Sequence, residues 1–517
     1  MHKNESSYTD RWINRSINPV VFGILGGILF FIFILNMLRI HVPDSDMYFL
    51  IASGREIINK GIIHNNVWTI DSSSGIVIQQ WLYCIIVSYV DRFGIYGLYA
   101  FVFSEIVLFG LVLFAFFRNC KISRITSLLM ICVILTVSQA YLFSIRPEII
   151  TIILLLSECI IIEKYQTSNK VFWLALLPVI FFLEINLHAS MWPMHLAVIL
   201  AYFVPSFYCD KVNDRSIFKK KIPLLGAVVA SILALFVNPY GIKSIGYPFM
   251  IFSAKTSQYV PVLEMQLPYL LSTTSLIIII CCIMIVFAFR KGKLTSVSLH
   301  MSLGLMFMSI FMVRNMMFAP VMITFLLRDV FLSFDGFDKT KVVLKEIKNY
   351  VYPFIIVGII AGVVITIITV VRDTESYCEQ FASNISSACD YLDNNAKDEN
   401  HIFTGFNTGA YLEYRGFKNI YIDARPELFT SNFTGGKNIL RDYSRICAFG
   451  YSRVNDDLPA IVSGEEIDRW LEEYDFDYLI VQPNTERVLF AHLISTDTYH
   501  IVDSASCDEV LLFERTK

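Results

Sequence analysis

Residues 95–117 read IYGLYAFVFSEIVLFGLVLFAFF, an apolar run in which Glu105 is the one charged residue. About 20 apolar residues in an α-helix cross the roughly 30 Å hydrocarbon core of a bilayer, so this run predicts a transmembrane helix. Further apolar runs lie on both sides of it, at 20–38, 125–143, 148–162, 171–187, 191–207, 223–238, 269–289, 296–312, 316–333 and 350–371. The pattern predicts an α-helical polytopic membrane protein with about eleven transmembrane helices.

The composition fits this fold class and argues against others. The 517 residues are 55% hydrophobic and 17% charged, with a mean hydropathy of +0.56, whereas a soluble protein needs more charge on its surface. A net charge of -3, without a basic stripe that has interleaved aromatic residues, argues against a nucleic-acid partner. The eleven cysteines lack zinc-ligand spacing, and no GxGxxG or Walker pattern occurs, so we predict no metal and no cofactor.

The distribution of basic residues predicts the orientation, because cytoplasmic loops of membrane proteins are enriched in Lys and Arg. One alternating set of loops carries most of these residues, and the loops between them carry few. The asymmetry predicts a multi-pass protein of the plasma or inner membrane, with a cytoplasmic N-terminus and with 41–94 and 372–517 outside the cytoplasm. The basic loops hold Lys3, Arg11, Arg15, Arg118, Lys121, Arg124, Lys164, Lys170, Lys211, Arg215, Lys219, Lys220, Lys221, Arg290, Lys291, Lys293, Lys339, Lys341, Lys345 and Lys348.

The segment after the last apolar run mixes charged residues with short apolar stretches. This change predicts two domains, a transmembrane bundle over 1–371 and an extracytoplasmic α/β domain over 372–517. Cys378 and Cys389 in the second domain would pair if that side is oxidising, and the sequence leaves this open. Predicted strands lie at 402–403, 420–423, 478–482, 500–502 and 510–513, and predicted helices at 375–395, 437–447 and 465–474, with Ser463 as the N-cap of the last.

The loop after the first predicted helix holds the residues that most suggest chemistry. It begins His41-Val-Pro-Asp44-Ser-Asp46, which places two carboxylates where the chain leaves the bilayer. Residues 52–60 have amphipathic helical spacing, and the apolar stretch 76–90 is too short to cross a bilayer. We expect these two helices to lie along the membrane surface.

This arrangement resembles the GT-C superfamily of polyprenyl-phosphate-sugar-dependent glycosyltransferases, which includes protein O-mannosyltransferases and aminoarabinose transferases. Those enzymes carry one or two acidic residues in the first external loop, between two surface-lying helices. More narrowly, the chain resembles a bacterial membrane-protein family whose loop reads roughly Asp-x-Asp-x-Trp-Trp-His-Leu-x-x-Gly, followed later by Trp-Leu. The residues that match this pattern or its chemistry are Asp44, Asp46, Tyr48, Phe49, Gly54, Trp81 and Leu82, while Leu50 replaces the family's histidine.

The narrower resemblance extends along nearly the whole chain. Each further motif is weak by itself, and their common order is the more specific feature. The resemblance implies that a sugar is transferred from a polyprenyl phosphate to an envelope glycan, lipid or protein, with inversion at the anomeric carbon. It implies metal independence if the chain is similar to the branch that transfers monosaccharides. The further motifs are IRPE at 145–148, NLH at 186–188, NPYG at 238–241, RN at 314–315, GAYL at 409–412 and IDAR at 422–425.

Such a transfer needs a carboxylate that takes the proton of the acceptor hydroxyl and cations that stabilise the departing phosphate. Each candidate also has a simpler interpretation: aspartates are common in solvated turns, arginines at helix ends reach for the interface, and a histidine can cap a helix. The candidates are Asp44 or Asp46 as the base, Arg146 and Arg314 for the lipid phosphate, and His188, Tyr48 and Trp81 for the acceptor or substrate.

Two other functions stay open from the sequence. A transporter or flippase of a lipid-linked substrate predicts functional charges near the middle of the bilayer. The suggestive residues lie instead at the predicted external face, which favours the enzyme. A non-catalytic envelope-assembly protein of the same fold is the second alternative, and Leu50 supports it. We interpret Glu105 and Glu158 as hydrogen-bonded to neighbouring helices, and Asp423 with Arg425 as a buried structural pair.

Overall fold

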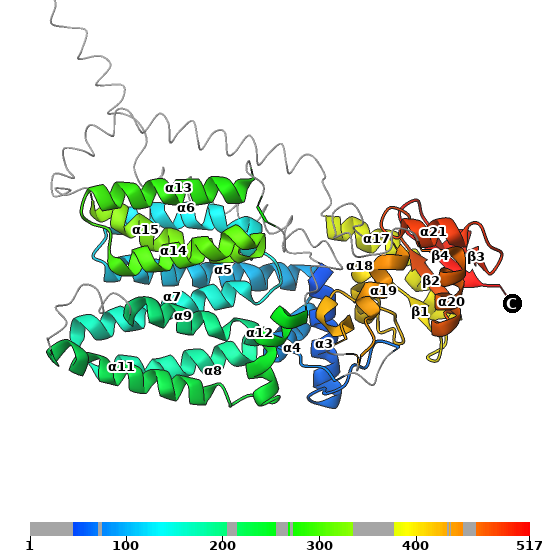
Figure 1. The fold of residues 1–517 in the computed structure, drawn as a ribbon, viewed down its shortest axis with the longest axis horizontal. Helices are drawn as coiled ribbons and strands as arrows, with labels where there is room; N and C mark the ends of the chain where they lie inside the picture. Colours follow the sequence, from blue (N-terminus) through cyan, green and yellow to red (C-terminus); the bar gives the residue numbers. More distant parts are fainter. Residues whose placement is uncertain are drawn as a thin grey trace, which may run out of the picture. The chain divides into compact units, whose positions relative to one another are not determined.

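The computed structural model describes residues 45–516 apart from 71–74, 204–214, 255–266, 269–271, 334–376, 432–433, 435 and 448–461. Within these ranges the chain forms a helical bundle up to Leu332 and a smaller α/β region from Tyr377 (Figure 1). Asp44 and the predicted helices at 20–38 and 350–371 lie outside the described residues.

The helices of the bundle lie close to the apolar runs of the sequence. Ser123, Ser272 and Thr295 each accept a hydrogen bond from a first-turn N–H, which explains why three of these helices begin where they do. Among the described helices, Gly94–Asn119 and Val313–Leu332 are long and apolar enough to cross a membrane, and the total of about eleven crossings stays a prediction. The helices are α5 (Gly94–Asn119), α6 (Arg124–Leu142), α7 (Glu148–Ser168), α8 (Leu177–Leu187), α9 (Trp192–Phe203), α11 (Arg215–Ala234), α12 (Ile242–Ala254), α13 (Thr273–Arg290), α14 (Ser296–Phe311) and α15 (Ala319–Leu332).

Three helices of the bundle are each preceded directly by a short 3-10 helix. The 3-10 helices are η1 (Val171–Leu176) before α8, η2 (Ala189–Met191) before α9 and η5 (Val313–Phe318) before α15. Pro178 and Pro320 stand at the start of α8 and α15. A proline is tolerated in the first helical turn because its missing N–H would have no partner there.

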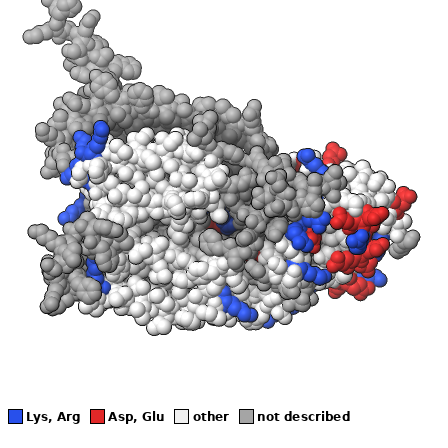
Figure 2. Space-filling view, in the orientation of Figure 1, with Lys and Arg blue, Asp and Glu red and all other residues white. Residues whose placement is uncertain are grey.

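Apolar side chains fill the bundle and also cover its surface. The rings of Phe116 on α5 and Phe325 on α15 are both fully buried and meet edge to face, with centroids 5.1 Å apart. Other large apolar side chains point outward, for example Ile283 at 63% and Phe289 at 71% exposure. Figure 2 shows a face of the bundle with few charged side chains, whereas Asp, Glu, Lys and Arg gather over the C-terminal region. A bundle that is apolar outside as well as inside suits a lipid surrounding.

Two helices precede the bundle, and they pack closely against each other. The predicted helix at 52–60 begins earlier, so that α3 covers Ser45–Lys60 and Asp46 lies in its first turn. The second, α4 (Trp81–Asp91), lies within the predicted apolar stretch. A Cβ atom on Gly54 of α3 would come within 2.0 Å of the Cys84 carbonyl oxygen on α4. Only glycine therefore permits this contact.

The C-terminal region contains a four-stranded sheet in the order β1-β2-β4-β3. β1 pairs with β2 in parallel, and β4 is antiparallel to both β2 and β3. The sheet strands are β1 (Ile402–Phe403), β2 (Tyr478–Val481), β3 (Tyr499–Ile501) and β4 (Leu511–Arg515). The helical elements are α17 (Tyr377–Asn395), α18 (Phe406–Arg415), η7 (Pro426–Phe429), α19 (Ile439–Cys447), α20 (Gly464–Tyr474), α21 (Arg487–Leu493) and η8 (Asp503–Ala505), and Ser463 caps α20 as predicted.

One prediction for this region was wrong. Residues 420–423 form no strand, because Ile420 makes isolated bridges to Ile402 and to Thr69 of the loop before α4. The sequence left open whether Cys378 and Cys389 pair, and the structure argues against a disulfide because both residues lie on α17, eleven positions apart. That spacing separates them by roughly 16 Å, far beyond disulfide reach. Cys389 is a buried free thiol.

Candidate active site

Asp46 and Arg146, two of the predicted site residues, form an ion pair at the end of the bundle that contacts the α/β region. Arg146 Nη2 lies 3.1 Å from Asp46 Oδ2, and the side chains are 20% and 24% exposed, respectively. Asp46 stands in the first turn of α3, where a helix favours negative charge. Arg146 precedes Pro147, which disfavours helix at Arg146, so α7 starts only at Glu148. The beginnings of α3 and α7 thus position the pair, and both side chains stay partly exposed to a ligand.

Arg314, the second predicted phosphate ligand, pairs with Glu148 beside the first pair. Its Nη2 lies 3.4 Å from Glu148 Oε1, with the arginine 35% exposed and the glutamate 7% exposed. The other carboxylate oxygen of Glu148 is buried and makes no hydrogen bond within the described residues. The α/β end of the bundle therefore presents two guanidinium groups and two carboxylates, and we call Asp46, Arg146, Glu148 and Arg314 the α/β-end cluster.

His188 lies beneath this cluster, and its hydrogen bond fixes its tautomer. The Thr151 hydroxyl donates to Glu184 Oε1 at 2.7 Å and lies 2.9 Å from His188 Nδ1. Because the hydroxyl has one proton and gives it to the carboxylate, it accepts from His188 Nδ1–H. In neutral His188, Nε2 is then the basic nitrogen. The ring is only 2% exposed, so His188 supports the cluster from inside the bundle.

A histidine between two carboxylates continues this polar chain into the middle of the bundle. His195 Nδ1 lies 2.7 Å from Glu158 Oε2, and its Nε2 lies 3.3 Å from Glu184 Oε2. All three side chains are fully buried. The interpretation of Glu158 as hydrogen-bonded to a neighbouring helix is confirmed, since its partner lies on α9. The same interpretation of Glu105 was wrong, because both of its carboxylate oxygens are buried without a hydrogen bond from the described residues. Ionisable residues inside a membrane bundle are costly and mark functional positions by default.

Trp81 and Tyr48 lie outside the α/β-end cluster, and each connects neighbouring elements of the fold. The Trp81 indole N–H donates to Asn186 Oδ1 at 3.0 Å and ties the start of α4 to the end of α8. The Tyr48 ring meets Tyr411 at 4.9 Å and Tyr414 at 5.4 Å, both on α18. Tyr48 therefore connects α3 to the α/β region. Binding of an acceptor by either residue stays a prediction.

The α/β region contacts the same helices through a buried arginine. Arg425 lies 4.9 Å from the ring centroid of Trp68 and 5.3 Å from that of Phe49. It pairs with Asp423 and with Glu413, each at 2.6 Å. The predicted structural pair of Asp423 and Arg425 is thus confirmed, and it also anchors this region on α3.

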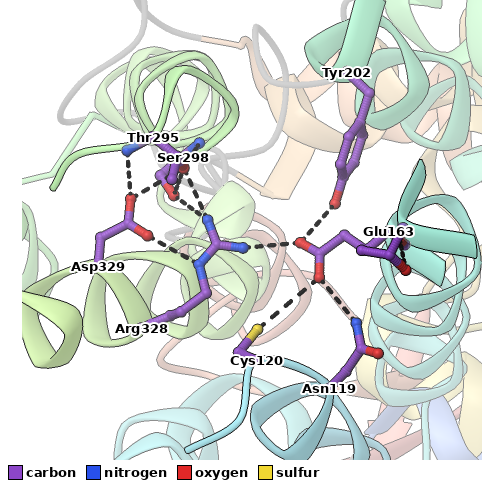
Figure 3. Close-up of polar contacts among 9 residues, drawn as sticks. Asn119, Cys120, Glu163, Tyr202, Thr295, Ser298, Arg328 and Asp329 are labelled. Atoms are coloured by element: carbon purple, nitrogen blue, oxygen red, sulfur yellow. Dashed lines mark hydrogen bonds and ion pairs between the residues drawn. The ribbon is translucent and has the colours of Figure 1, made fainter.

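A second cluster lies at the opposite end of α7, and we call Glu163, Thr295, Ser298, Arg328 and Asp329 the opposite-end cluster. Figure 3 shows Arg328 between the two carboxylates. Arg328 donates to Asp329 at 2.9 Å and to Glu163, Thr295 and Ser298 at 2.8 Å each. Glu163 is fifteen residues after Glu148, a distance of roughly 22 Å along the helix.

Glu148, Thr151, Glu184 and His195 were not predicted as site residues. One signal was available: Glu148, Thr151 and Glu158 stand at positions i, i+3 and i+10, which share one face of a helix. Glu184 and His195 lie on other helices, so no spacing links them to that face. Within the described ranges, no three His, Cys, Asp or Glu side chains converge as metal ligands.

Comparison with known proteins identifies the fold. No protein-family model matches the sequence, and no curated protein matches it either. The crystal structure of the Archaeoglobus fulgidus oligosaccharyltransferase, tethered to an acceptor peptide containing the NVT sequon, is similar to this chain with a TM-score of 0.54. The match covers 95% of this chain and 74% of that chain at 10% sequence identity. The chain therefore has the GT-C fold, the fold of a membrane glycosyltransferase.

Proposed function

We propose that this chain is an integral membrane glycosyltransferase of the GT-C type. It moves a sugar from a polyprenyl-phosphate donor to an envelope glycan, lipid or protein outside the cytoplasm. The likeness to an oligosaccharyltransferase supports the class of reaction. The observation that carries the proposal is the Asp46–Arg146 pair, a carboxylate and a guanidinium group 3.1 Å apart and open to a ligand.

Asp46 is the proposed base. A carboxylate can accept a proton, and the Asp46 side chain is 24% exposed beside its arginine partner. The acceptor hydroxyl gives its proton to this carboxylate as its oxygen attacks the anomeric carbon. The bond between that carbon and the phosphate oxygen breaks, and the lipid phosphate leaves with the electron pair. Asp44, which lies outside the described residues, is the alternative base.

Arg146 and Arg314 are the proposed phosphate ligands. Guanidinium groups match phosphate geometry, and both side chains keep an exposed part. Their charge stabilises the leaving phosphate most as the bond breaks, which lowers the barrier rather than only strengthening donor binding. Glu148 orients Arg314, and buried His188 supports the site from below.

Transfer by the purified full-length chain in lipid nanodiscs tests the proposal. A panel of polyprenyl-phosphate sugars is offered with candidate envelope acceptors, and wild type is compared with Asp46→Asn and Asp44→Asn. Loss of a general base lowers the rate by about 10²–10⁴-fold. We expect a loss of this size for Asp46→Asn, with the folded fraction unchanged.

Asp468→Asn is the matched control, because it removes an exposed aspartate whose partner is His492 in the α/β region. We expect it to transfer at the wild-type rate. Full turnover in both the Asp44→Asn and Asp46→Asn variants would eliminate the assignment of the base. If wild type transfers no sugar from any donor, the non-catalytic assembly protein becomes the better explanation.

A transporter or flippase is the second candidate, and one observation favours it. His195, Glu158 and Glu184 form a buried ionisable group within the bundle, where a transport pathway would place one. Liposomes that carry a fluorescent lipid-linked sugar distinguish the two functions. A flippase moves the headgroup across the bilayer without an acceptor and loses this activity in Glu158→Gln, whereas a transferase consumes the sugar only when an acceptor is present.

A further inference from the structure

A pocket lies between α3, α4 and α18, away from the α/β-end cluster. Its volume is about 520 Å³. Arg55 follows Asp46 by nine residues on α3, which places it roughly 13 Å along the helix and on the opposite face. A ligand in this pocket is therefore separate from the Asp46–Arg146 pair. The lining residues are Arg55, Ile58, Asn59, Ser88, Asp91, Arg92 and Tyr414.

The two arginines of the pocket are held in place before any ligand arrives. Arg55 donates to Asp91 Oδ2 at 2.6 Å and to the Tyr414 carbonyl oxygen at 2.8 Å. Its guanidinium group also lies 4.5 Å from the centroid of the Tyr414 ring. Arg92 lies 4.7 Å from the centroid of the Tyr89 ring. Fixed side chains lose little entropy on binding, so such a pair is suited to recognition.

The charges of the pocket favour an anion. Asp91 neutralises Arg55, and Arg92 makes no ion pair with any carboxylate that the structure describes. The pocket thus carries one surplus positive charge. The amide of Asn59 and the hydroxyl of Ser88 add hydrogen-bond donors to the lining. A phosphate group with one negative charge matches this set of donors.

The exposed aromatic residues beside Arg92 indicate the level of the membrane surface. Tyr89, Phe93 and Tyr96 are 47%, 78% and 80% exposed. They stand where α5 begins, and outward-facing apolar residues such as Leu111, at 60% exposure, follow along that helix. Membrane proteins concentrate Tyr and Trp at the boundary between lipid and water. Arg92, between Tyr89 and Phe93, is therefore at the depth of the lipid headgroups.

We propose that this pocket binds the phosphate of a membrane lipid through Arg92, with Arg55, Asn59 and Ser88 completing the site. The lipid is either a resident anionic phospholipid or a polyprenyl phosphate. The proposal requires the membrane insertion of the fold and does not depend on the transfer reaction.

Native mass spectrometry of the full-length chain tests this site. Protein in detergent is loaded with phosphatidylglycerol, with a short polyprenyl monophosphate or with diacylglycerol, and the retained lipid is counted. We expect retention of a phosphate lipid but not of diacylglycerol. Arg92→Gln removes charged hydrogen bonds to the phosphate and lowers retention about tenfold. Asp91→Asn raises the surplus charge and increases retention. Arg290→Gln, a change at an exposed arginine on α13, leaves it unchanged.

The two phosphate lipids identify the source. Competition by polyprenyl monophosphate against phosphatidylglycerol assigns the pocket to the donor or its product, and retention of phosphatidylglycerol alone assigns it to a resident phospholipid. Equal retention in wild type and Arg92→Gln overturns the site. Retention of diacylglycerol at the level of phosphatidylglycerol overturns the phosphate assignment, and binding of soluble glycerol phosphate as tight as that of the lipids overturns the membrane placement.

Discussion

At one end of α7, Glu163 pairs with Arg328 in a cluster whose charged groups all have hydrogen-bond partners. At the other end, Glu148 pairs with Arg314 in a cluster that is less completely hydrogen-bonded. Arg328 is 8% exposed and its ion pairs measure 2.8 and 2.9 Å. Arg314 is 35% exposed and its pair measures 3.4 Å, with one Glu148 oxygen buried and unsatisfied in the described part of the chain.

The two clusters contain the same residue types but have different roles. Four of the five N–H donors of buried Arg328 are used within the cluster, so it is poorly suited to bind a ligand and instead connects α7, α14 and α15. Arginines that remain partly exposed beside an unsatisfied carboxylate keep donors for a phosphate. Unsatisfied buried polar groups are rare in folded proteins and call for an explanation. The degree of satisfaction, and not the presence of charge, therefore distinguishes the two ends.

The largest expected effect on folding is that of Arg328→Met. Removal of one partner of a buried ion pair leaves the other charge uncompensated and costs about 3–5 kcal/mol. Here Glu163 and Asp329 would both lose their cation. We expect the free energy of unfolding in detergent to fall by that amount, as measured by chemical denaturation. Arg290→Met, at an exposed arginine, is the control and should change it by less than about 0.5 kcal/mol.

A double variant sharpens this result. Glu163→Gln together with Arg328→Met removes a charge from each side, so part of the lost stability should return. If Arg328→Met unfolds no more easily than Arg290→Met, the opposite-end cluster is not a structural fastening and the contrast with the α/β end fails.

Glu486 shows what a buried carboxylate does without any arginine. Burial raises the pKa of this side chain to about 7, and the described residues offer it no cation, only the Tyr443 hydroxyl and the Gln482 N–H. The unfolded chain has an ordinary pKa of about 4.3, so the folded state binds the proton more tightly. Its contribution of about 4 kcal/mol is complete below pH 4 and is lost as the pH rises through 7.

Amide exchange of β2 measures this loss, because Tyr478–Val481 lies in the core of the α/β region. After correction for intrinsic exchange rates, protection should fall between pH 5 and pH 8. Glu486→Gln should show a flat profile over that range. A wild-type profile as flat as that of the variant contradicts the burial of the charge.

The α/β-end arginines should affect activity far more than stability. Arg146→Gln or Arg314→Gln should each lower kcat/KM for transfer by about 10²–10³-fold, the effect of losing one preorganised donor. Both ion pairs are partly exposed, and such pairs contribute about 1 kcal/mol or less to folding. Donor titrations and denaturation of the same preparations separate the two effects. A variant that loses several kcal/mol of stability while keeping its activity would show a structural cluster.

Much of the helical framework could be predicted, because membrane-length apolar runs and capping residues are local signals. The helix bounds at 95–117 and 296–312 differ from those of α5 and α14 by one or two residues. Short amphipathic helices such as α18 and α21 were missed, since a few mixed residues give little periodicity. The strand predicted at 420–423 was wrong, because β1, which Ile420 contacts, is only two residues long.

Asp46, Arg146 and Arg314, three of the four residues of the α/β-end cluster, were predicted from the sequence. The contact between Asp46 and Arg146, one hundred positions apart, could not be predicted, because it depends on how α3 lies against the start of α7. The close approach of α3 to α4 at Gly54 is likewise a tertiary contact that leaves no local pattern in the sequence. His195 gave no local signal, because a histidine in an apolar helix acquires meaning only from the carboxylates on its neighbours.

The smallest effect concerns Thr295, which caps α14 and also touches Arg328. Its hydroxyl accepts from Ser298 N–H at 3.2 Å and from Arg328 at 2.8 Å, and it lies 3.1 Å from Asp329 Oδ2. Ser123 caps α6 in the same way without contact to this cluster. Loss of either cap costs about 1 kcal/mol.

Thr295→Ala should therefore destabilise the protein by more than Ser123→Ala does, because it also removes hydrogen bonds with Arg328 and Asp329. The difference should be about 2 kcal/mol, the usual net contribution of two such bonds, and denaturation of both variants beside wild type measures it. Equal losses would mean that Thr295 acts as a cap alone. The opposite-end cluster would then depend on its ion pairs, and the contrast with the α/β end would rest on charge pairing rather than on complete satisfaction.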